Sequence, residues 1–232
     1  MQIDLQKIEF KGEGHSFLKK EIFSTIKENA VIIDGGCKQG WWMQSVNKYI
    51  PNYLNLTINR IGVDPISYGE TQVNGKYTHY IQAAIGLEDQ DEVDFYIVGS
   101  EPGCNSLLKP SQMLQNTSYI GKKREITEIK KVPKRRLDSI LNDLNISSEI
   151  YYVKLDLQGA DLDAVKSLGD HLPRVKYIEM EMSLDKDNPF YENSPFIEEI
   201  IENLDFFGFE PIQFSSFPLS PLPEGELLFR RK

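Results

Sequence analysis

Apolar residues follow two alternating spacings along the chain, one typical of helices and the other of buried strands. Residues 15–28 place them three and four positions apart, which predicts an amphipathic helix. The short apolar run 30–33 stops at an acid and two glycines, which predicts a buried strand ending in a tight turn. A helix over 41–49 and strands over 60–63 and 78–85 follow. This order predicts successive β-α-β units.

The pattern changes at about residue 91. The runs 93–98 and 125–132, with a Pro-Gly turn between them, are typical of paired strands rather than of another crossover. We therefore expect an inserted, antiparallel β segment over about residues 91–136. The later predicted elements are helices at 137–144, 161–168 and 195–207, and strands at 151–157, 175–182, 209–214 and 227–230. The last two strands are expected to form a terminal antiparallel hairpin.

Together these elements predict an α/β fold with a doubly wound, mostly parallel, seven-stranded Rossmann-like sheet. The 232 residues suffice for one such domain, so we expect a helical segment, 1–29, packed on a single domain, 30–232. No stretch approaches the roughly 20 consecutive apolar residues of a membrane span, and the first residues lack the pattern of a signal peptide. A cytoplasmic protein is expected.

Charge and cysteine content narrow the classes of partner. The net charge of -9 argues against indiscriminate nucleic-acid binding. The two cysteines, far apart, fit neither a disulfide framework nor a zinc site, so no metal is expected. One segment, 122–136, carries eight Lys and Arg residues against two Glu. It either recruits an anionic acceptor or forms a solvated strand edge that resists aggregation, and we favour the second interpretation.

The most informative stretch follows the first predicted strand, where Asp34, Gly35 and Gly36 precede Gly40 and a helix. Ligands of open parallel sheets bind beyond the carboxyl ends of the strands, so this loop predicts a cofactor site. It fits neither the dinucleotide pattern nor a phosphate-binding loop. An acid there suits a cofactor that bears an ammonium group. The next strand ends at Asp64, whose carboxylate can accept hydrogen bonds from both hydroxyls of a ribose.

These two acids together indicate one cofactor. An adenosine with a cationic amino-acid tail meets both requirements, and S-adenosylmethionine is the common cofactor of that description. The alternative is that Asp34 caps the following helix and Asp64 merely precedes a proline turn. That alternative explains each acid but not their register on consecutive strands.

Seven segments cover nearly the whole chain from residue 30, namely VIIDGGCKQG, GVDP, AAIG, CNSLL, VPKRRLDSIL, YVKLDLQGADLDAVKSLG and YIEMEMS. In sequence and in order they resemble the FkbM-type S-adenosylmethionine-dependent methyltransferases. The sixth, residues 152–169, is the most specific. Gln158 and Asp161 stand where the family usually has glutamates, Asp64 replaces its usual glutamate, and Gly35 and Cys37 vary the first motif. Among the three replaced glutamates, only Gln158 loses the charge.

The resemblance implies a doubly wound methyltransferase fold and O-methylation of a hydroxyl on a sugar, glycan or small-molecule metabolite. It implies cofactor contacts at Asp34, Gly35, Gly36, Cys37, Gly40, Asp64, Ala83 and Ala84, and substrate contacts at Asn105, Ser106, Gln158 and Asp161. Two alternatives stay open. One is a non-catalytic S-adenosylmethionine-binding module, and the other is an RNA methyltransferase, for which segment 122–136 is the only indication.

Methyl transfer to a hydroxyl is helped by a base, because the hydroxyl loses a proton as it attacks. Asp156, at the carboxyl end of the predicted strand 151–157, is the best candidate for this catalytic role. Lys154 and Glu181 are expected near the same edge of the sheet. Asp156 can instead be a structural or substrate-positioning carboxylate. Because Lys154 and Asp156 share one face of a strand, a simple ion pair between them is the other interpretation.

Overall fold

The computed structural model describes residues 19–50, 56–67, 75–99, 102–119, 122–185, 187, 189–216 and 224–232. Its helices are α1 (Lys19–Phe23), α2 (Trp41–Val46), α4 (Gln112–Gln115), α5 (Leu137–Asp143), α6 (Asp161–Lys166) and α7 (Ile197–Phe206), with 3-10 turns η2 (Pro102–Cys104) and η3 (Gly169–Arg174). Its strands are β1 (Val31–Gly35), β2 (Asn59–Val63), β3 (His79–Ile81), β4 (Ala84–Ile85), β5 (Gln90–Val98), β6 (Ser118–Tyr119), β7 (Lys122–Lys123), β8 (Ile126–Arg135), β9 (Ile150–Leu155), β10 (Val175–Ser183), β11 (Phe209–Ser216) and β12 (Glu224–Arg231).

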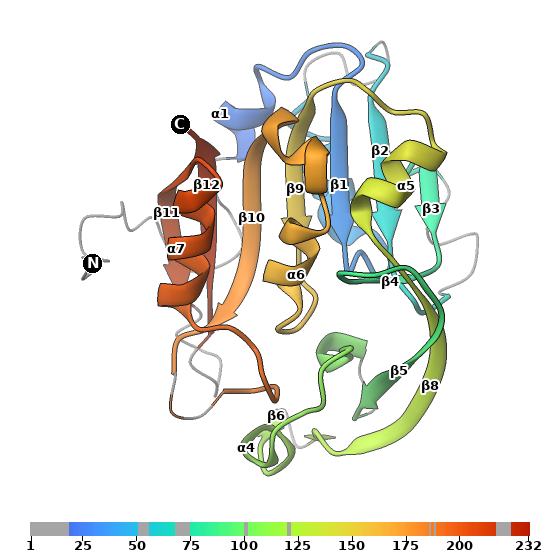
Figure 1. Ribbon diagram of the computed structural model, residues 1–232, viewed down its shortest axis with the longest axis vertical. Coiled ribbons are helices and arrows are strands. Elements are labelled where there is room, and N and C mark those ends of the chain that lie inside the picture. Colours follow the sequence, from blue (N-terminus) through green and yellow to red (C-terminus); the bar gives the residue numbers. More distant parts are fainter. Residues whose placement is uncertain are drawn as a thin grey trace.

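Seven strands form the main sheet, in the order β11-β12-β10-β9-β1-β2-β3 (Figure 1). The pairings among β3, β2, β1, β9 and β10 are parallel, and β12 runs antiparallel between β10 and β11. The predicted mostly parallel sheet with a terminal hairpin is therefore confirmed. From β1 the chain continues to β2 on one side, whereas β9 lies on the other side, so the strand order reverses at β1. Ligands of such sheets bind at this reversal, beyond the carboxyl ends.

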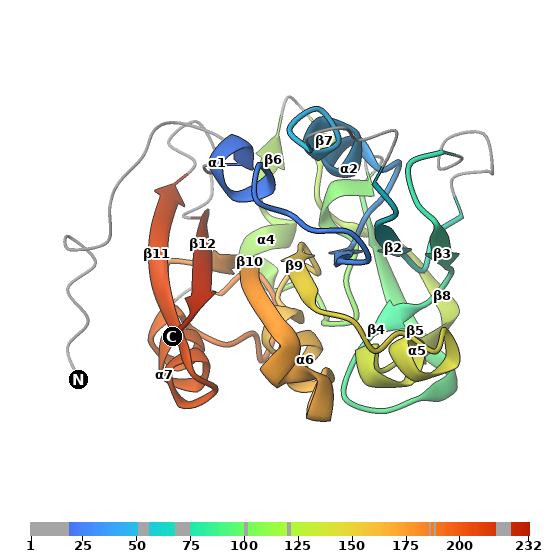
Figure 2. The same ribbon diagram turned by 90° about the horizontal axis from the view of Figure 1, so that it is seen from above.

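Helices cover both faces of the main sheet, which explains why its central strands are apolar at successive positions. α1 and α2 lie on one face, and α5, α6 and α7 lie on the other (Figure 2). Neighbouring residues of β1 point to opposite faces. Ile32 packs with the α1 and α2 side, whereas Ile33 packs with the α5, α6 and α7 side. All five residues of β1 and all six of β9 are buried.

The structure differs from the predicted elements in two places. The run 78–85, predicted as one strand, is divided into β3 in the main sheet and β4 in a second sheet. The chain turns between them, where the Ala83 N–H donates to the Ile81 carbonyl oxygen at 3.1 Å. The predicted helix 15–28 is helical at 19–23 within the described residues, and its first four positions lie outside them.

The inserted segment forms β structure of its own, as expected. β5 and β8 pair antiparallel and, with β4, make a three-stranded sheet. This sheet extends past the carboxyl ends of the main strands (Figure 1). Apolar side chains of Ala84, Phe95 and Val132 form its core. The insertion therefore stands beside the sheet edge at which ligands are expected to bind.

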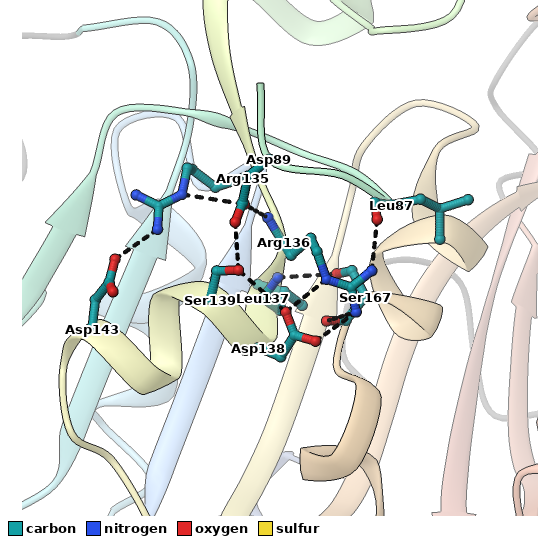
Figure 3. Close-up of polar contacts among 9 residues, drawn as sticks. All are labelled: Leu87, Asp89, Arg135, Arg136, Leu137, Asp138, Ser139, Asp143 and Ser167. Atoms are coloured by element: carbon teal, nitrogen blue, oxygen red, sulfur yellow. Dashed lines mark hydrogen bonds and ion pairs between the residues drawn. The ribbon is translucent and has the colours of Figure 1, made fainter. Parts of the chain in front are cut away.

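Ion pairs fasten the base of the insertion to α5 of the main domain. Arg135 contacts Asp89 at 3.3 Å and Asp143 at 2.6 Å. Arg136 contacts Asp138 and also donates to the Leu87 carbonyl oxygen at 2.6 Å (Figure 3). The last two cations of segment 122–136 are thus engaged with acids of this chain, which fixes the direction in which β8 meets α5.

Candidate active site

A pocket of about 480 Å³, the first pocket, opens beyond the carboxyl ends of β1, β2 and β9, with the insertion as its outer wall. Its lining residues are Gly36, Lys38, Val63, Asp64, Pro65, Ile66, Ala83, Ala84, Ile85, Phe95, Gly103, Asn105, Leu107, Asp156, Leu157, Gln158 and Ala160. Four of the predicted cofactor residues are among them, namely Gly36, Asp64, Ala83 and Ala84. The structure therefore brings the ends of two neighbouring strands and the start of β4 around one cavity.

Gly36 forms the floor of the first pocket between the ends of β1 and β9. Its φ of +71° lies in the left-handed region, and a Cβ at this position would overlap the carbonyl oxygen of Asp156. Its N–H donates to the Val63 carbonyl oxygen at 2.9 Å, so the turn is tied to β2 as well. Only glycine avoids both the steric overlap and the backbone strain here. The floor of the pocket is consequently bare backbone.

Asp34 lies beneath this floor and does not line the pocket. It is fully buried, and the Tyr77 hydroxyl donates to its Oδ2 at 2.6 Å. The ring of Tyr77 packs within 2.9 to 3.0 Å of the places where Cβ atoms would stand at Gly40 and Gly62. Asp34 and Gly40 therefore shape the loop after β1 through Tyr77, a residue that the sequence pattern does not single out.

Gly35 and Cys37 likewise do not line the first pocket. Burial raises the pKa of the Cys37 thiol well above its ordinary value, and the charges of Asp34 and Asp64 raise it further. The thiol is consequently a poor nucleophile.

Asp64 presents a buried carboxylate to the first pocket, with 4% of its surface exposed. Its Oδ2 accepts from the Lys38 N–H and its Oδ1 from the Ile66 N–H, both at 2.9 Å. Burial raises the pKa of Asp64 to about 6, although these backbone hydrogen bonds lower it. Each carboxylate oxygen has two lone pairs, so each retains the capacity to accept one hydroxyl of a ligand.

Asp156 forms the ion pair that its spacing from Lys154 allowed, with 3.2 Å between Nζ and Oδ2. Burial alone would raise the pKa of Asp156, but the charge of Lys154 outweighs it and holds that pKa well below its usual range. Burial likewise lowers the pKa of Lys154, and the charges of Asp156 and Asp34 more than reverse this. Asp156 is therefore firmly ionised and weakly basic.

Gln158 stands between two carboxylates at the ends of β9 and β10. Its Nε2 donates to Asp156 Oδ1 at 2.8 Å and to Glu181 Oε2 at 2.6 Å. Its Oε1 accepts from the Tyr191 hydroxyl at 2.9 Å. The left-handed backbone of Gln158, with φ of +56°, directs the side chain into this position. Tyr191 is a site residue that sequence reasoning missed.

A second pocket, of about 410 Å³, lies on the other side of Gln158. Its lining residues are Gln158, Gly159, Asp161, Glu181, Met182, Ser183, Phe190, Tyr191, Ser194, Pro195, Ile200 and Glu224. Burial raises the pKa of Glu181 well above its ordinary value, and the charges of Asp156 and Glu224 raise it further. Glu181 is therefore the more basic of the two carboxylates that contact Gln158.

Asp161 borders the second pocket and also holds the loop after β9. Its Oδ1 accepts from the Leu157 N–H and its Oδ2 from the Gly159 N–H, both at 3.2 Å. Burial and the charge of Asp156 raise the pKa of Asp161 to about 7. Part of the role of Asp161 is consequently to shape the loop that carries Gln158.

The two predicted substrate residues of the insertion have different surroundings. Asn105 lines the first pocket, and its Oδ1 accepts from the Val98 N–H at 3.0 Å. Ser106 is fully buried and lines neither pocket. Its hydroxyl donates to the Gln158 carbonyl oxygen at 2.8 Å, so it fastens the insertion to the loop after β9.

Within the described ranges, no group of three or more His, Cys, Asp or Glu side chains is arranged to hold a metal ion. No helix in the described part of the chain is both long and apolar enough to cross a bilayer.

Comparisons with solved structures find several methyltransferases at low identity. A putative rRNA-methylase from Clostridium thermocellum is 12% identical, with 92% of this chain and 93% of that chain covered and a TM-score of 0.48. Fibrillarin from Aeropyrum pernix, with natively bound S-adenosyl-L-methionine, is 11% identical, with 91% and 73% covered and a TM-score of 0.46. The N-methyltransferase NodS from Bradyrhizobium japonicum WM9 is 6% identical, with 92% of each chain covered and a TM-score of 0.46. These distant likenesses say nothing about the acceptor of this chain.

The comparison with curated proteins gives no match. The model of the methyltransferase FkbM domain matches residues 49–211, which is more than half of the chain. The matched range includes Asp64, the loop after β9 and β10, and it begins after the loop that follows β1. The chain therefore belongs to the FkbM methyltransferase family, with its Rossmann-like fold, and is an S-adenosylmethionine-dependent methyltransferase.

Proposed function

We propose that this enzyme methylates a hydroxyl group of a sugar, a glycan or a small-molecule metabolite. The cofactor binds in the first pocket and the acceptor in the second pocket. The observation that carries this proposal is the junction of the two pockets at Gln158, with Asp156 on the cofactor side and Glu181 on the acceptor side. A methyl donor and a methyl acceptor must meet at one point, and these pockets share that residue.

The residues of the first pocket fit S-adenosylmethionine. Asp64 can accept the ribose hydroxyls, and apolar side chains such as Ile66, Ile85 and Phe95 offer a surface for the adenine. The bare backbone at Gly36 leaves room above the floor. The bound cofactor supplies an electrophilic methyl carbon on a positively charged sulfur. The ionised carboxylate of Asp156 favours such a charge nearby.

Glu181 is the side chain that we assign as the base. The acceptor hydroxyl must be held within roughly 3 to 3.5 Å of the methyl carbon, and it loses its proton as it attacks. Asp156 accepts a proton poorly because Lys154 lowers its pKa, whereas burial raises the pKa of Glu181. In this assignment the proton passes to the Glu181 carboxylate, and Lys154 and Asp156 provide a fixed charged pair beside the reaction.

The lining of the second pocket favours an acceptor without negative charge. Asp161, Glu181 and Glu224 border it, and they would repel a phosphate or a uronic acid. Ser183 and Ser194 also line this pocket, and their hydroxyls can donate to and accept from the hydroxyls of a sugar.

The cations of segment 122–136 add little to the case for RNA. Lys123, Lys130 and Lys131 form ion pairs with neighbouring acids, as do Arg135 and Arg136. A neutral, hydroxyl-rich acceptor is therefore preferred to RNA.

Mass spectrometry with methyl-labelled S-adenosylmethionine tests this function. The panel contains neutral sugars and polyols, their phosphorylated and uronic-acid counterparts, and short RNA. We expect label on a hydroxyl of a neutral compound, and labelling slowed by roughly 100-fold or more when Glu181→Gln replaces the wild type. Label on RNA would contradict the acceptor class. Binding of S-adenosylhomocysteine without labelling of any compound would favour the non-catalytic module.

A further inference from the structure

The amide of Gln158 bridges two acids that would otherwise face each other without a donor between them. Its Nε2 contacts Asp156 Oδ1 and Glu181 Oε2, so one amino group donates to both carboxylates. Neighbouring carboxylates disfavour one another's ionisation, and a donor between them relieves this. The side chain at position 158 therefore influences whether Glu181 carries a proton.

Tyr191 supports the orientation in which the amino end of the Gln158 amide faces the acids, an orientation that the ionised Asp156 also favours because it can only accept. The oxygen and nitrogen of an amide have nearly the same shape, so hydrogen-bond partners decide its orientation. The buried Tyr191 hydroxyl has one proton, which it shares between Gln158 Oε1 at 2.9 Å and the Cys104 carbonyl oxygen at 2.8 Å. With Oε1 held by a donor, the amino group of Gln158 points at the two carboxylates.

The backbone of Gln158 is held as firmly as its side chain. Its φ of +56° is in the left-handed region, and its carbonyl oxygen accepts from the Ser106 hydroxyl. The backbone contacts therefore fix where the Gln158 side chain begins, and the hydrogen bonds to Asp156, Glu181 and Tyr191 hold its amide.

We propose that Gln158, oriented by Tyr191, is a positioning residue that clamps Asp156 and Glu181 together and favours the ionised form of Glu181. This inference rests on the proposed role of Glu181 as the base. The hydrogen bond that Gln158 donates stabilises the ionised form of Glu181. Burial and the nearby acids have the opposite effect and raise the pKa of Glu181. These acids are Asp156 after β9, Glu224 and Glu226 from β12, and Asp161 from α6. A carboxylate can take a proton from the acceptor only if it is ionised beforehand.

Carbon-13 NMR of carboxyl-labelled glutamate measures the effect directly, without an acceptor. The Glu181 resonance is assigned by its loss in Glu181→Gln. In Gln158→Glu, an acid replaces the donor with little change of shape, and the pKa of Glu181 should rise by roughly one pH unit or more. In Tyr191→Phe, the amide loses its orienting donor, and a smaller rise of roughly half a unit is expected.

Tyr151→Phe is the matched control, because it also removes a buried phenol that donates to a carbonyl oxygen. Tyr151 contacts Ile22 and Thr25 of the α1 region, away from Glu181. Its removal should leave the Glu181 titration unchanged. Thermal unfolding and S-adenosylhomocysteine binding show which variants fold. If one of the two test variants, Gln158→Glu or Tyr191→Phe, does not fold, the other suffices for the test.

An unchanged Glu181 titration in a folded test variant would overturn the positioning role, as would an equal rise in Tyr151→Phe. The result is independent of the methylation experiment. If the titrations shift but no acceptor is labelled, the proposed function is wrong and the positioning role of Gln158 stands. If an acceptor is labelled but the titrations do not shift, the proposed function stands and the positioning role is wrong.

Discussion

The proposed contact of Asp64 with the ribose gives a pH dependence whose direction follows from the structure. The pKa of Asp64 is about 6, above its ordinary value of 3.8, because the carboxyl group is buried. The ionised form accepts two hydroxyl hydrogen bonds, and the protonated form loses part of that capacity. Cofactor affinity should therefore be full above pH 7 and decrease as the pH falls through 6.

The size of the effect follows from the same value. If only the ionised carboxylate holds the ribose, affinity falls by about tenfold between pH 7 and pH 5. The decrease in affinity cannot exceed the free energy that these hydrogen bonds contribute to binding, about 1.5 to 3 kcal/mol for hydrogen bonds to a charged group. Asp64→Ala should show that loss at pH 7.5. Asp64→Asn keeps the shape and removes the titration, so its affinity should be weaker and nearly independent of pH.

Isothermal titration calorimetry with S-adenosylhomocysteine from pH 5 to pH 8 is the assay. Subtracting the Asp64→Asn profile removes contributions from other groups, including Asp161 with its pKa of about 7. A wild-type affinity that is flat across this range would refute the reasoning. So would equal affinities of the wild type and a folded Asp64→Ala at pH 7.5, since another residue would then hold the ribose.

Three further predictions concern the base, the pocket floor and the basic segment. Glu181→Gln should lower turnover by roughly 100-fold or more while S-adenosylhomocysteine affinity changes by only a few-fold, and equal losses in both would make Glu181 a cofactor ligand. Gly36→Ala should lower the free energy of unfolding by about 1 to 3 kcal/mol from backbone strain alone. Denaturant unfolding measures this loss, and an unchanged denaturation midpoint would refute the tight turn. Exchange of Lys130, Lys131 and Lys134 for glutamine should leave the affinities for cofactor and acceptor unchanged and promote aggregation in light-scattering assays. If the acceptor affinity of the wild type falls with salt and that of the variant does not, the segment is instead a docking surface.

The main sheet is predictable because its signal lies within each strand. β1 begins with the apolar run 31–33 and β9 with the largely apolar run 150–153, and each strand is followed by a turn that contains glycine. The break within residues 78–85 carries no such signal, because only Gln82 marks it and the segment contains no glycine or proline. The chain leaves the main sheet there because Ile85 pairs with Arg135, a partner fifty residues later.

The candidate site is predictable only where it lies at strand ends. Asp64, Asp156 and Gln158 meet around one cavity because parallel strands place their carboxyl ends at the same edge. Tyr77 and Tyr191 reach their partners from positions 43 and 33 residues further along the chain, through irregular segments. No periodic pattern links such residues, and only the folded structure shows them.

A crystal structure with bound S-adenosylhomocysteine tests the central claim most directly, because the claim assigns the two pockets to donor and acceptor. The account predicts ribose hydroxyls at Asp64, adenine against the apolar wall of the first pocket, and the sulfur directed toward Gln158 and the second pocket. An adenosine bound away from Asp64, or a sulfur that faces away from Gln158, would contradict it.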